Sequence, residues 1–188
     1  MAGHALVVGG TGMLAGAVRG LVARGWRVSV LARRAGAFAL REPGVCGLDC
    51  NYNDTDALVA TLNRARDGEG AIDLAVGWFH TLGPAPMLAT RTGGLGAPGR
   101  FFHVLGSAMA DPDRPDRLAA AAKAARAAEI APICAYRQVV LGFVLEGQGA
   151  RWLTNDEISA GVLQAIDDDA PLSTIGVTRP WSARPPVG

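Results

Sequence analysis

Near its N-terminus the sequence contains a short apolar run that stops at clustered glycines, Ala5-Leu-Val-Val-Gly9-Gly10-Thr11-Gly12-Met-Leu-Ala-Gly16. After the glycines, Leu14, Val18, Leu21 and Val22 recur at three- and four-residue spacing, which is typical of an amphipathic helix. Gly25 is suited to end that helix, and residues 26–32 form a second apolar run that predicts a strand. Strand, glycine turn, helix and strand together predict a βαβ unit, and therefore parallel strands.

The glycine turn of this unit has the composition of an anion-binding loop. Glycine adopts positive φ in a tight turn, and without a Cβ it lets a phosphate approach the backbone closely. The free N–H groups and the positive end of the next helix stabilise an anion there, as in dinucleotide-binding proteins. We therefore expect a pyrophosphate at this loop. The residues expected to contact the cofactor are Gly9, Gly10, Thr11, Gly12, Met13 and Leu14. Alternatively, the same turn occurs in α/β proteins that bind no nucleotide.

The remainder of the chain continues to alternate between the two periodicities. Strands are expected over residues 45–48, 71–76, 100–105, 133–144 and 173–178. Helices are expected from Asp54 or Thr55, over 116–130, and from the capping box at Thr154 to Ile166, with a loop over 83–99. This order predicts an α/β fold, with a doubly wound, mostly parallel sheet of the Rossmann type and helices on both faces. Without a repeat or linker, residues 1–188 are predicted to be one domain.

Composition excludes several classes of protein. Hydrophobic residues make up 49% of the 188 residues, enough for a core, and 18 basic against 17 acidic residues give a net charge of +1. No charged run indicates a nucleic-acid or membrane surface, and no segment has the pattern of a signal peptide or transmembrane helix. We expect a cytoplasmic protein with a small-molecule substrate and no nucleic-acid or membrane partner, whose apolar fraction is compatible with a homodimer. Cys46, Cys50 and Cys134 are scattered, so buried thiols are expected rather than a disulfide or metal site.

The end of the second strand indicates which dinucleotide is preferred. An NAD enzyme of this layout usually has an acidic residue there, to bind the ribose diol. This chain has Arg33 and Arg34 instead, about 20 residues beyond the glycine turn. Because a guanidinium binds phosphate and no carboxylate repels it, the pair favours NADP over NAD, with Arg33 as the main contact. Alternatively, the two arginines are simply exposed residues of a loop.

The glycine loop resembles the cofactor loop of the short-chain dehydrogenase/reductase superfamily. Gly9, Gly12 and Ala15 fit the form Gly-x-x-Gly-x-x-Ala. Thr11, Gly12 and Gly16 fit most of a second form, Thr-Gly-x-x-x-Gly, whose final glycine is replaced here by Val18. Asp49, after the third strand, resembles the aspartate that members of the superfamily use near the adenine. Ser107, after the fifth strand, stands where the superfamily often has a catalytic serine. The resemblance implies a Rossmann fold and an oxidoreductase that uses a nicotinamide cofactor.

The sequence also departs from the superfamily's pattern. The superfamily's catalytic Tyr-x-x-x-Lys pair is missing, because the chain's one lysine is Lys123 and the residue four before it is Ala119. The Asn-Ala-Gly signature is replaced by Gly77-Trp-Phe-His80. The chain thus resembles atypical members, a group of reductases, isomerases, lyases and cofactor-binding regulators. We expect an NADPH-dependent reductase of a carbonyl or imine on a small apolar or planar metabolite. The alternative is an NADP-binding sensor, or a non-redox isomerase or lyase.

Three residues are candidates for the chemistry. Tyr136 is a candidate proton donor, although a tyrosine packed between sheet and helix is the alternative. His80 follows the fourth strand and is a second candidate, because imidazole exchanges protons near neutral pH. Ser107 is suited to orient a substrate oxygen, or else to cap a helix. Trp78 is a candidate to pack against the nicotinamide or a flat substrate, or else belongs to the core.

Overall fold

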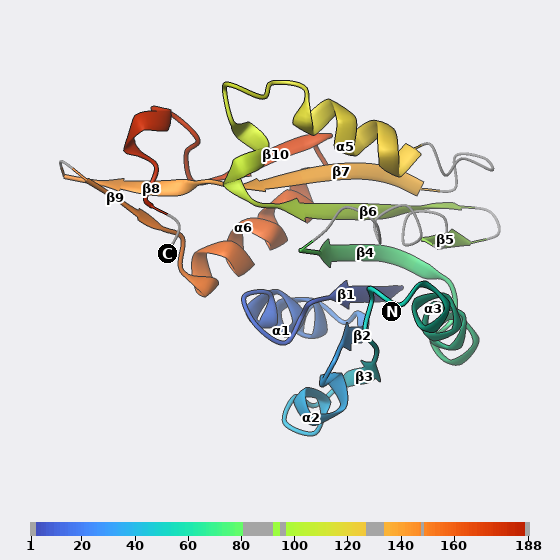
Figure 1. Ribbon diagram of the computed structural model, residues 1–188. Coiled ribbons are helices and arrows are strands. Elements are labelled where there is room, and N and C mark those ends of the chain that lie inside the picture. The colour runs from blue at the N-terminus through green and yellow to red at the C-terminus, as the bar shows by residue number, and fades with distance from the viewer. Residues whose placement is uncertain (1–2, 81–91, 95–96, 127–133, 148, 187–188) are drawn as a thin grey trace.

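A seven-stranded parallel sheet is the framework of the structure (Figure 1). The computed structural model describes residues 3–80, 92–94, 97–126, 134–147 and 149–186. In spatial order the parallel strands are β3 (Val45–Asp49), β2 (Arg27–Ala32), β1 (His4–Val8), β4 (Ile72–Trp78), β6 (Ala97–Leu105), β7 (Cys134–Leu141) and β10 (Leu172–Ile175). The order reverses at β1 and β4, so the crevice between their carboxyl ends is where such a sheet binds ligands.

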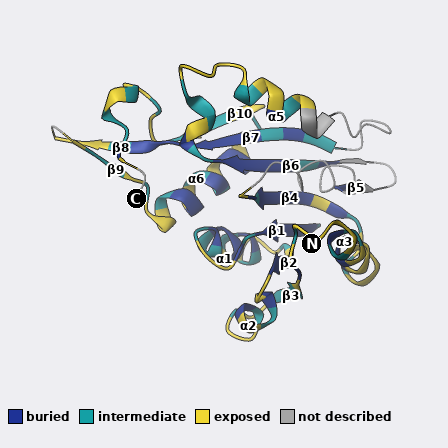
Figure 2. Cartoon of the chain, in the orientation of Figure 1, coloured by how far each residue is buried: buried dark blue, intermediate teal, exposed yellow. Residues whose placement is uncertain are grey.

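Helices cover both faces of the sheet, which confirms the predicted fold class. They are α1 (Ala15–Ala23), α2 (Ala35–Ala39), α3 (Thr55–Glu69), α5 (Arg117–Arg126) and α6 (Asn155–Asp168). Helices α1, α2 and α6 pack on one face through a cluster that includes Leu21 and Val162. Helix α3 packs on the other face through Leu58 and Leu62, and α5 contributes Ala122 there. Figure 2 shows the buried residues concentrated in the central strands between these two layers.

Local sequence signals account for the helix boundaries. Asp54 caps α3, its side chain accepting a hydrogen bond from the Ala57 N–H at 3.0 Å. The predicted capping box of α6 is present, with Thr154 and Glu157 each accepting a hydrogen bond from the other's backbone N–H. After α1, Gly25 takes φ of +80°, the left-handed conformation expected of a glycine that ends a helix.

The expected strand over 133–144 is wrong in its extent. Strand β7 ends at Leu141, and after Gly142 the chain begins β8 (Phe143–Glu146), which pairs with β9 (Gly149–Trp152) as an antiparallel hairpin. At Gly142 a Cβ would collide with the carbonyl oxygen of Val177, so only glycine fits at this position. Because residues on both sides of Gly142 are apolar, the hydrophobic pattern does not mark the boundary between β7 and β8.

The expected loop over 83–99 is also partly wrong. Strand β5 (Gly93–Gly94) runs antiparallel to the starts of β4 and β6, and β6 begins at Ala97. The remainder of that loop prediction, and the end of the predicted helix over 116–130, lie outside the described residues. No helix in the described ranges combines the length and apolar composition needed to cross a membrane.

The cysteines do not all lie in the interior as expected. Cys50 is buried and Cys134 is half-buried, but Cys46 is exposed on β3 at the edge of the sheet. Burial raises the pKa of the Cys134 thiol to about 12, so this thiol stays protonated near neutral pH. Within the ranges that the structure describes, no three histidine, cysteine, aspartate or glutamate side chains are grouped so that they could hold a metal ion.

Candidate functional site

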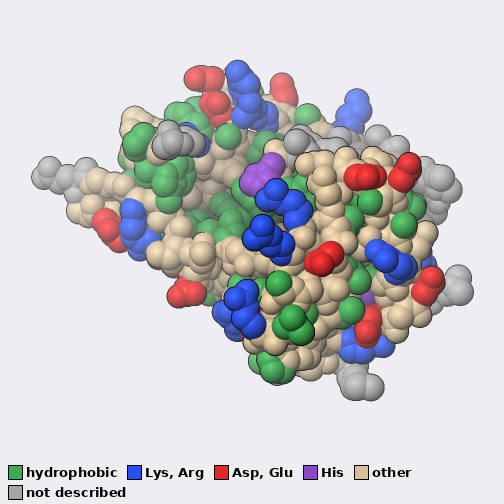
Figure 3. Space-filling model, turned by 60° about the horizontal axis from the view of Figure 1, so that its bottom comes forward, with side chains coloured by type: hydrophobic (Ala, Val, Ile, Leu, Met, Phe, Trp, Pro, Cys, Tyr) green, Lys and Arg blue, Asp and Glu red, His purple; other side chains and the backbone are tan. Residues whose placement is uncertain are grey.

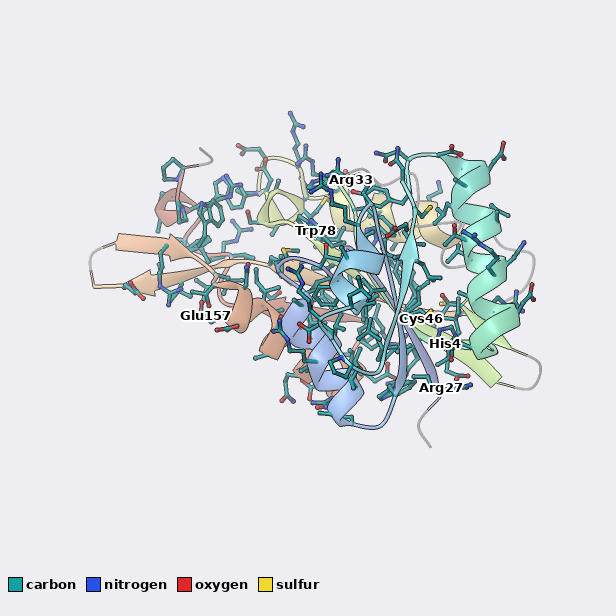
Figure 4. The ribbon with its side chains drawn as sticks, turned by 90° about the horizontal axis from the view of Figure 1, so that it is seen from below. His4, Arg27, Arg33, Cys46, Trp78 and Glu157 are labelled. Carbon is teal, nitrogen blue, oxygen red and sulfur yellow. The ribbon has the colours of Figure 1, made fainter. Side chains whose placement is uncertain are left out.

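A pocket of about 180 Å³ opens at the carboxyl edge of the sheet. The ends of β4, β6 and β7 form its floor, while β9 and the start of α6 form its walls. Its lining residues are Trp78, Gly106, Ser107, Leu141, Gly142, Trp152, Leu153 and Ile158. Figure 4 shows that Arg33 and Trp78 lie toward this end of the molecule, whereas His4, Arg27 and Cys46 lie toward the opposite end. Figure 3 shows hydrophobic side chains in a hollow of the surface, with basic side chains and a histidine along its margin.

The glycine loop lies between β1 and α1, beside this pocket. Gly9 takes φ of +78°, and a Cβ there would lie 3.2 Å from the Trp78 carbonyl oxygen. Gly10 packs inward, where a Cβ would lie 3.0 Å from methyl groups of Val7 and Val18. At Gly12, in contrast, a Cβ would meet no heavy atom within 4 Å. The loop therefore turns tightly at Gly9, closes against the core at Gly10, and presents bare backbone to open space at Gly12.

Helix α6 holds the far end of the glycine loop in place. The Ser159 hydroxyl donates a hydrogen bond to the Met13 carbonyl oxygen at 2.9 Å. A Cβ at Gly16 would lie only 2.8 Å from the Ser159 Cβ, so glycine permits the close approach of α1 to α6. Leu14 is fully buried, so its side chain belongs to the core rather than to the surface of the loop. Helix α1 has no side-chain cap, and its Ala15 N–H donates to the Gly12 carbonyl oxygen at 2.9 Å. The positive end of the helix dipole therefore faces the loop without a side-chain partner.

Arg33 and Arg34 follow β2 and are both exposed. Helix α2, which the sequence analysis did not predict, begins directly after them with Arg34 as its N-cap. The Asp49 carboxylate at the end of β3 accepts a hydrogen bond from the Gly36 N–H at 2.8 Å, and so stabilises the start of α2. Asp49 therefore has a structural partner on the adenine side of the candidate site. With only five residues, α2 is too short to show a periodicity.

Trp78 joins the glycine loop to the pocket. Its indole lies within 4 Å of the position that a Cβ would occupy at Gly9, and likewise at Gly106. The exposed His80 ring lies edge-on to Trp78, with 6.1 Å between the ring centroids. The structure thus brings Trp78 and Ser107 together in the pocket, with His80 beside Trp78.

Ser107 has a cationic partner that the sequence analysis missed. The Arg184 Nε donates a hydrogen bond to the Ser107 Oγ at 2.9 Å. The Arg184 guanidinium also lies over two indoles, 5.0 Å from the ring centre of Trp152 and 5.1 Å from that of Trp181. Arg184 follows the short helix η2 (Trp181–Ala183), in a proline-rich tail that the sequence did not connect to the site. The only signal was the pair of tryptophans, whose proximity depends on the tertiary fold.

Tyr136 does not line this pocket. It lies in the core cluster between the sheet and α3 and α5, where it is 7% exposed. Its hydroxyl is 2.7 Å from the His103 Nδ1. Burial lowers the pKa of His103 to about 4, so the imidazole is neutral near neutral pH. Lys123 is exposed on α5, so none of the residues that the structure describes recreates a Tyr-x-x-x-Lys pair.

A dinucleotide fits the residues at this edge of the sheet. Gly12 leaves space over the loop that a larger side chain would fill, and the positive end of the α1 dipole faces the place where a pyrophosphate would lie. The pocket continues from Trp78 away from the loop, where the nicotinamide end of an extended dinucleotide would be directed. The arrangement can hold an anion, a planar ring and a small substrate next to one another.

Comparison with known proteins identifies relatives by structure only. No protein-family model matches the sequence, and no curated protein matches it. A short-chain dehydrogenase/reductase from Serratia marcescens has a TM-score of 0.69 and 18% identity, with 94% of this chain and 97% of that chain covered. An alcohol dehydrogenase from the archaeon Thermococcus sibiricus, solved in complex with 5-hydroxy-NADP, has a TM-score of 0.63 and 16% identity over 98% and 99% of the two chains.

A third neighbour is a short-chain oxidoreductase from Pseudomonas aeruginosa PAO1 that contains an atypical catalytic center. Its TM-score is 0.64 and its identity 14%, with 93% of this chain and 95% of that chain covered. At these identities the similarity concerns the fold, which agrees with the observed strand order and with helices on both faces of the sheet. The chain therefore has the Rossmann fold found in structures of short-chain dehydrogenases/reductases.

Proposed function

We propose that this protein is an oxidoreductase that binds NADP(H) and reduces a carbonyl or imine on a small apolar or planar metabolite. The observation that carries the proposal is the open space over Gly12, between a positive-φ Gly9 and the uncapped start of α1. That combination offers an anion open space beside the positive end of a helix, which a purely structural turn does not require. The complex of the Thermococcus neighbour with 5-hydroxy-NADP supports the same cofactor class.

Three groups of residues would hold the cofactor. The glycine loop would bind the pyrophosphate, Arg33 and Arg34 would contact the 2′-phosphate, and Trp78 would pack against the nicotinamide ring. The exposed arginines at the end of β2 support NADP, since no acidic residue occupies that position. A contact between Asp49 and the adenine side remains a prediction. When bound, NADPH supplies a hydride.

The protein's own residues would position the substrate and supply a proton. Because the Ser107 Oγ accepts a hydrogen bond from Arg184, its own hydrogen is free to bond to a substrate oxygen or nitrogen in the pocket. The hydrogen bond from the Arg184 Nε would hold the Ser107 hydroxyl in position for that contact. His80, at the exposed side of Trp78, is the other candidate proton donor. Tyr136 is not assigned this role, because its phenol is bonded to His103 in the core.

A second candidate function is an NADP-binding sensor, or a non-redox isomerase or lyase. The observation that favours it is the missing Tyr-x-x-x-Lys pair, together with the exposed position of Lys123. Both functions need the cofactor loop and the arginines. They differ in whether NADPH is consumed with a substrate.

The test is to follow NADPH absorbance while small aromatic and aliphatic aldehydes, ketones and cyclic imines are added to the purified full chain. The proposal predicts consumption with at least one class, and a fall of about 10²-fold or more in kcat when Ser107 is replaced by alanine, the range typical for loss of a proton-transfer or oxyanion group. Ser182→Ala is the matched control, because Ser182 is exposed on the neighbouring η2. NADPH binding without consumption would favour the second candidate.

A further inference from the structure

The C-terminal segment is fixed against the wall of the pocket by a series of contacts. The Arg184 backbone N–H donates to the Trp181 carbonyl oxygen at 3.1 Å, and Pro185 is buried. The Trp152 Nε1 donates to the Pro186 carbonyl oxygen at 3.2 Å, which ties this segment to β9. These contacts hold Arg184 in one place, so its guanidinium is oriented before any ligand arrives.

Among the residues that the structure describes, no carboxylate forms an ion pair with Arg184. Arg151, in the neighbouring hairpin, differs in this respect, because it forms ion pairs with both Glu146 and Glu157. The Arg184 side chain makes one hydrogen bond to the described part of the chain, from Nε to Ser107, and its guanidinium contacts two indole rings. A guanidinium has five N–H donors, and the four on the terminal nitrogens of Arg184 have no acceptor within the described ranges.

The surroundings of this cation determine what it can recognise. The guanidinium packs against the rings of Trp152 and Trp181, whereas its N–H groups lie in its own plane, so a ligand would bind along its edge. Planar, bidentate N–H groups match a carboxylate. The adjoining pocket, at about 180 Å³, is smaller than the roughly 300–1,000 Å³ of pockets for drug-sized ligands, and most of its lining side chains are apolar. The site therefore suits a small apolar or planar group that carries one carboxylate.

We propose that Arg184 is the anion-recognition residue of the site, and that the substrate is a small planar or apolar molecule with a carboxylate. This inference rests on the proposed function, because it names the substrate class of the same pocket. Ser107 then marks the boundary between the two parts of the substrate, with the carboxylate at Arg184 and the reacting atom toward Trp78. Selection of the substrate is by charge at one end and by shape in the apolar pocket.

The experiment uses benzoate and benzamide as probes, which share ring and shape but differ in charge. Calorimetric titrations of the full chain measure the affinity of each probe, with and without saturating NADPH. The expected result is that benzoate binds at least about tenfold more tightly than benzamide, as charge-assisted hydrogen bonds require. Because this comparison uses the unaltered protein, it does not depend on whether any variant folds. Equal affinities for the two probes, or no binding of benzoate, would overturn the proposal.

Two variants localise the effect. Arg184→Gln should weaken benzoate binding about tenfold or more while leaving benzamide unchanged, because glutamine keeps a planar amide but lacks the charge. Arg66→Gln on α3 removes the same charge from an exposed position and should leave both probes unchanged. A loss of benzoate affinity in Arg66→Gln equal to that in Arg184→Gln would contradict a local site.

The NADPH affinity of the same proteins separates this inference from the proposed function. If NADPH binds but benzoate is not preferred, the anion site is refuted and the proposed cofactor is retained. If benzoate is preferred but NADPH does not bind, the anion site holds and the proposed function fails. If Arg184→Gln weakens the binding of NADPH rather than that of benzoate, the guanidinium binds a cofactor phosphate, and the substrate assignment is wrong.

Discussion

Replacing Gly12 with valine should greatly weaken cofactor binding while leaving the fold intact. A Cβ at Gly12 meets no heavy atom within 4 Å, and the residue does not need positive φ. The free energy of unfolding should therefore change by no more than about 0.5 kcal/mol, as for other surface substitutions. The new side chain would, however, occupy the space over the loop in which we place the pyrophosphate.

The size of the binding loss follows from the donors that the anion would lose. A hydrogen bond to a charged group contributes about 1.5–3 kcal/mol, so displacement from two backbone N–H groups costs roughly 3–6 kcal/mol. That range corresponds to a weakening of about 10²- to 10⁴-fold in Kd. Titration calorimetry with NADPH measures the affinity, and thermal unfolding measures the stability of the same samples.

Gly68→Val is the matched control for this substitution. Gly68 is exposed on α3, and a Cβ there also meets no heavy atom within 4 Å. The control should bind NADPH as the unaltered protein does. Gly10→Val provides the opposite control, because its Cβ would press on Val7 and Val18 and so lower stability. Undiminished NADPH affinity in Gly12→Val would refute the placement of the pyrophosphate at this loop.

Three further predictions concern cofactor choice and the core. Arg33→Asp should weaken the binding of NADPH by at least about tenfold more than the binding of NADH in parallel titrations, because a carboxylate would replace a charge-assisted contact with the 2′-phosphate. Equal losses of affinity for the two cofactors would reject that contact. Tyr136→Phe should change kcat by no more than about twofold and should lower the free energy of unfolding by about 1–2 kcal/mol, because the hydrogen bond to His103 is lost in the core. A large fall in kcat with unchanged stability would instead indicate that Tyr136 takes part in the reaction. Burial lowers the pKa of His103 from 6.5 to about 4, so between these pH values the unfolded chain binds a proton that the folded protein does not. Stability should therefore decrease by roughly 3 kcal/mol as the pH falls from 6.5 to 4, and denaturant titrations of His103→Phe should show a smaller decrease.

The fold could be predicted where short stretches of sequence determine their own structure. The βαβ unit at the N-terminus combines period-two and period-3.6 patterns with glycines at the turn, and the structure places β1, α1 and β2 there. The caps of α3 and α6 were likewise readable, because each depends on a side chain and a backbone N–H three residues away.

Features that depend on distant contacts were not predictable. The boundary between β7 and β8 is set by the backbone of Val177, more than thirty residues along the chain from Gly142, rather than by a change in hydrophobicity. Arg184 became a candidate only when the fold placed it against Ser107, 77 positions away in the sequence. Tyr136 was a reasonable candidate by composition, but the interior position of its phenol follows from the pairing of β7 with β6.

The most direct test of the account is a pair of calorimetric titrations of the purified chain, one with NADPH and one with NADH. The glycine loop, the arginines after β2 and Trp78 together predict that NADPH binds with micromolar affinity and that NADH binds much more weakly. Tighter binding of NADH would contradict the role of Arg33 and Arg34. If neither dinucleotide binds, the glycine loop is only a structural turn, and the proposed oxidoreductase is refuted.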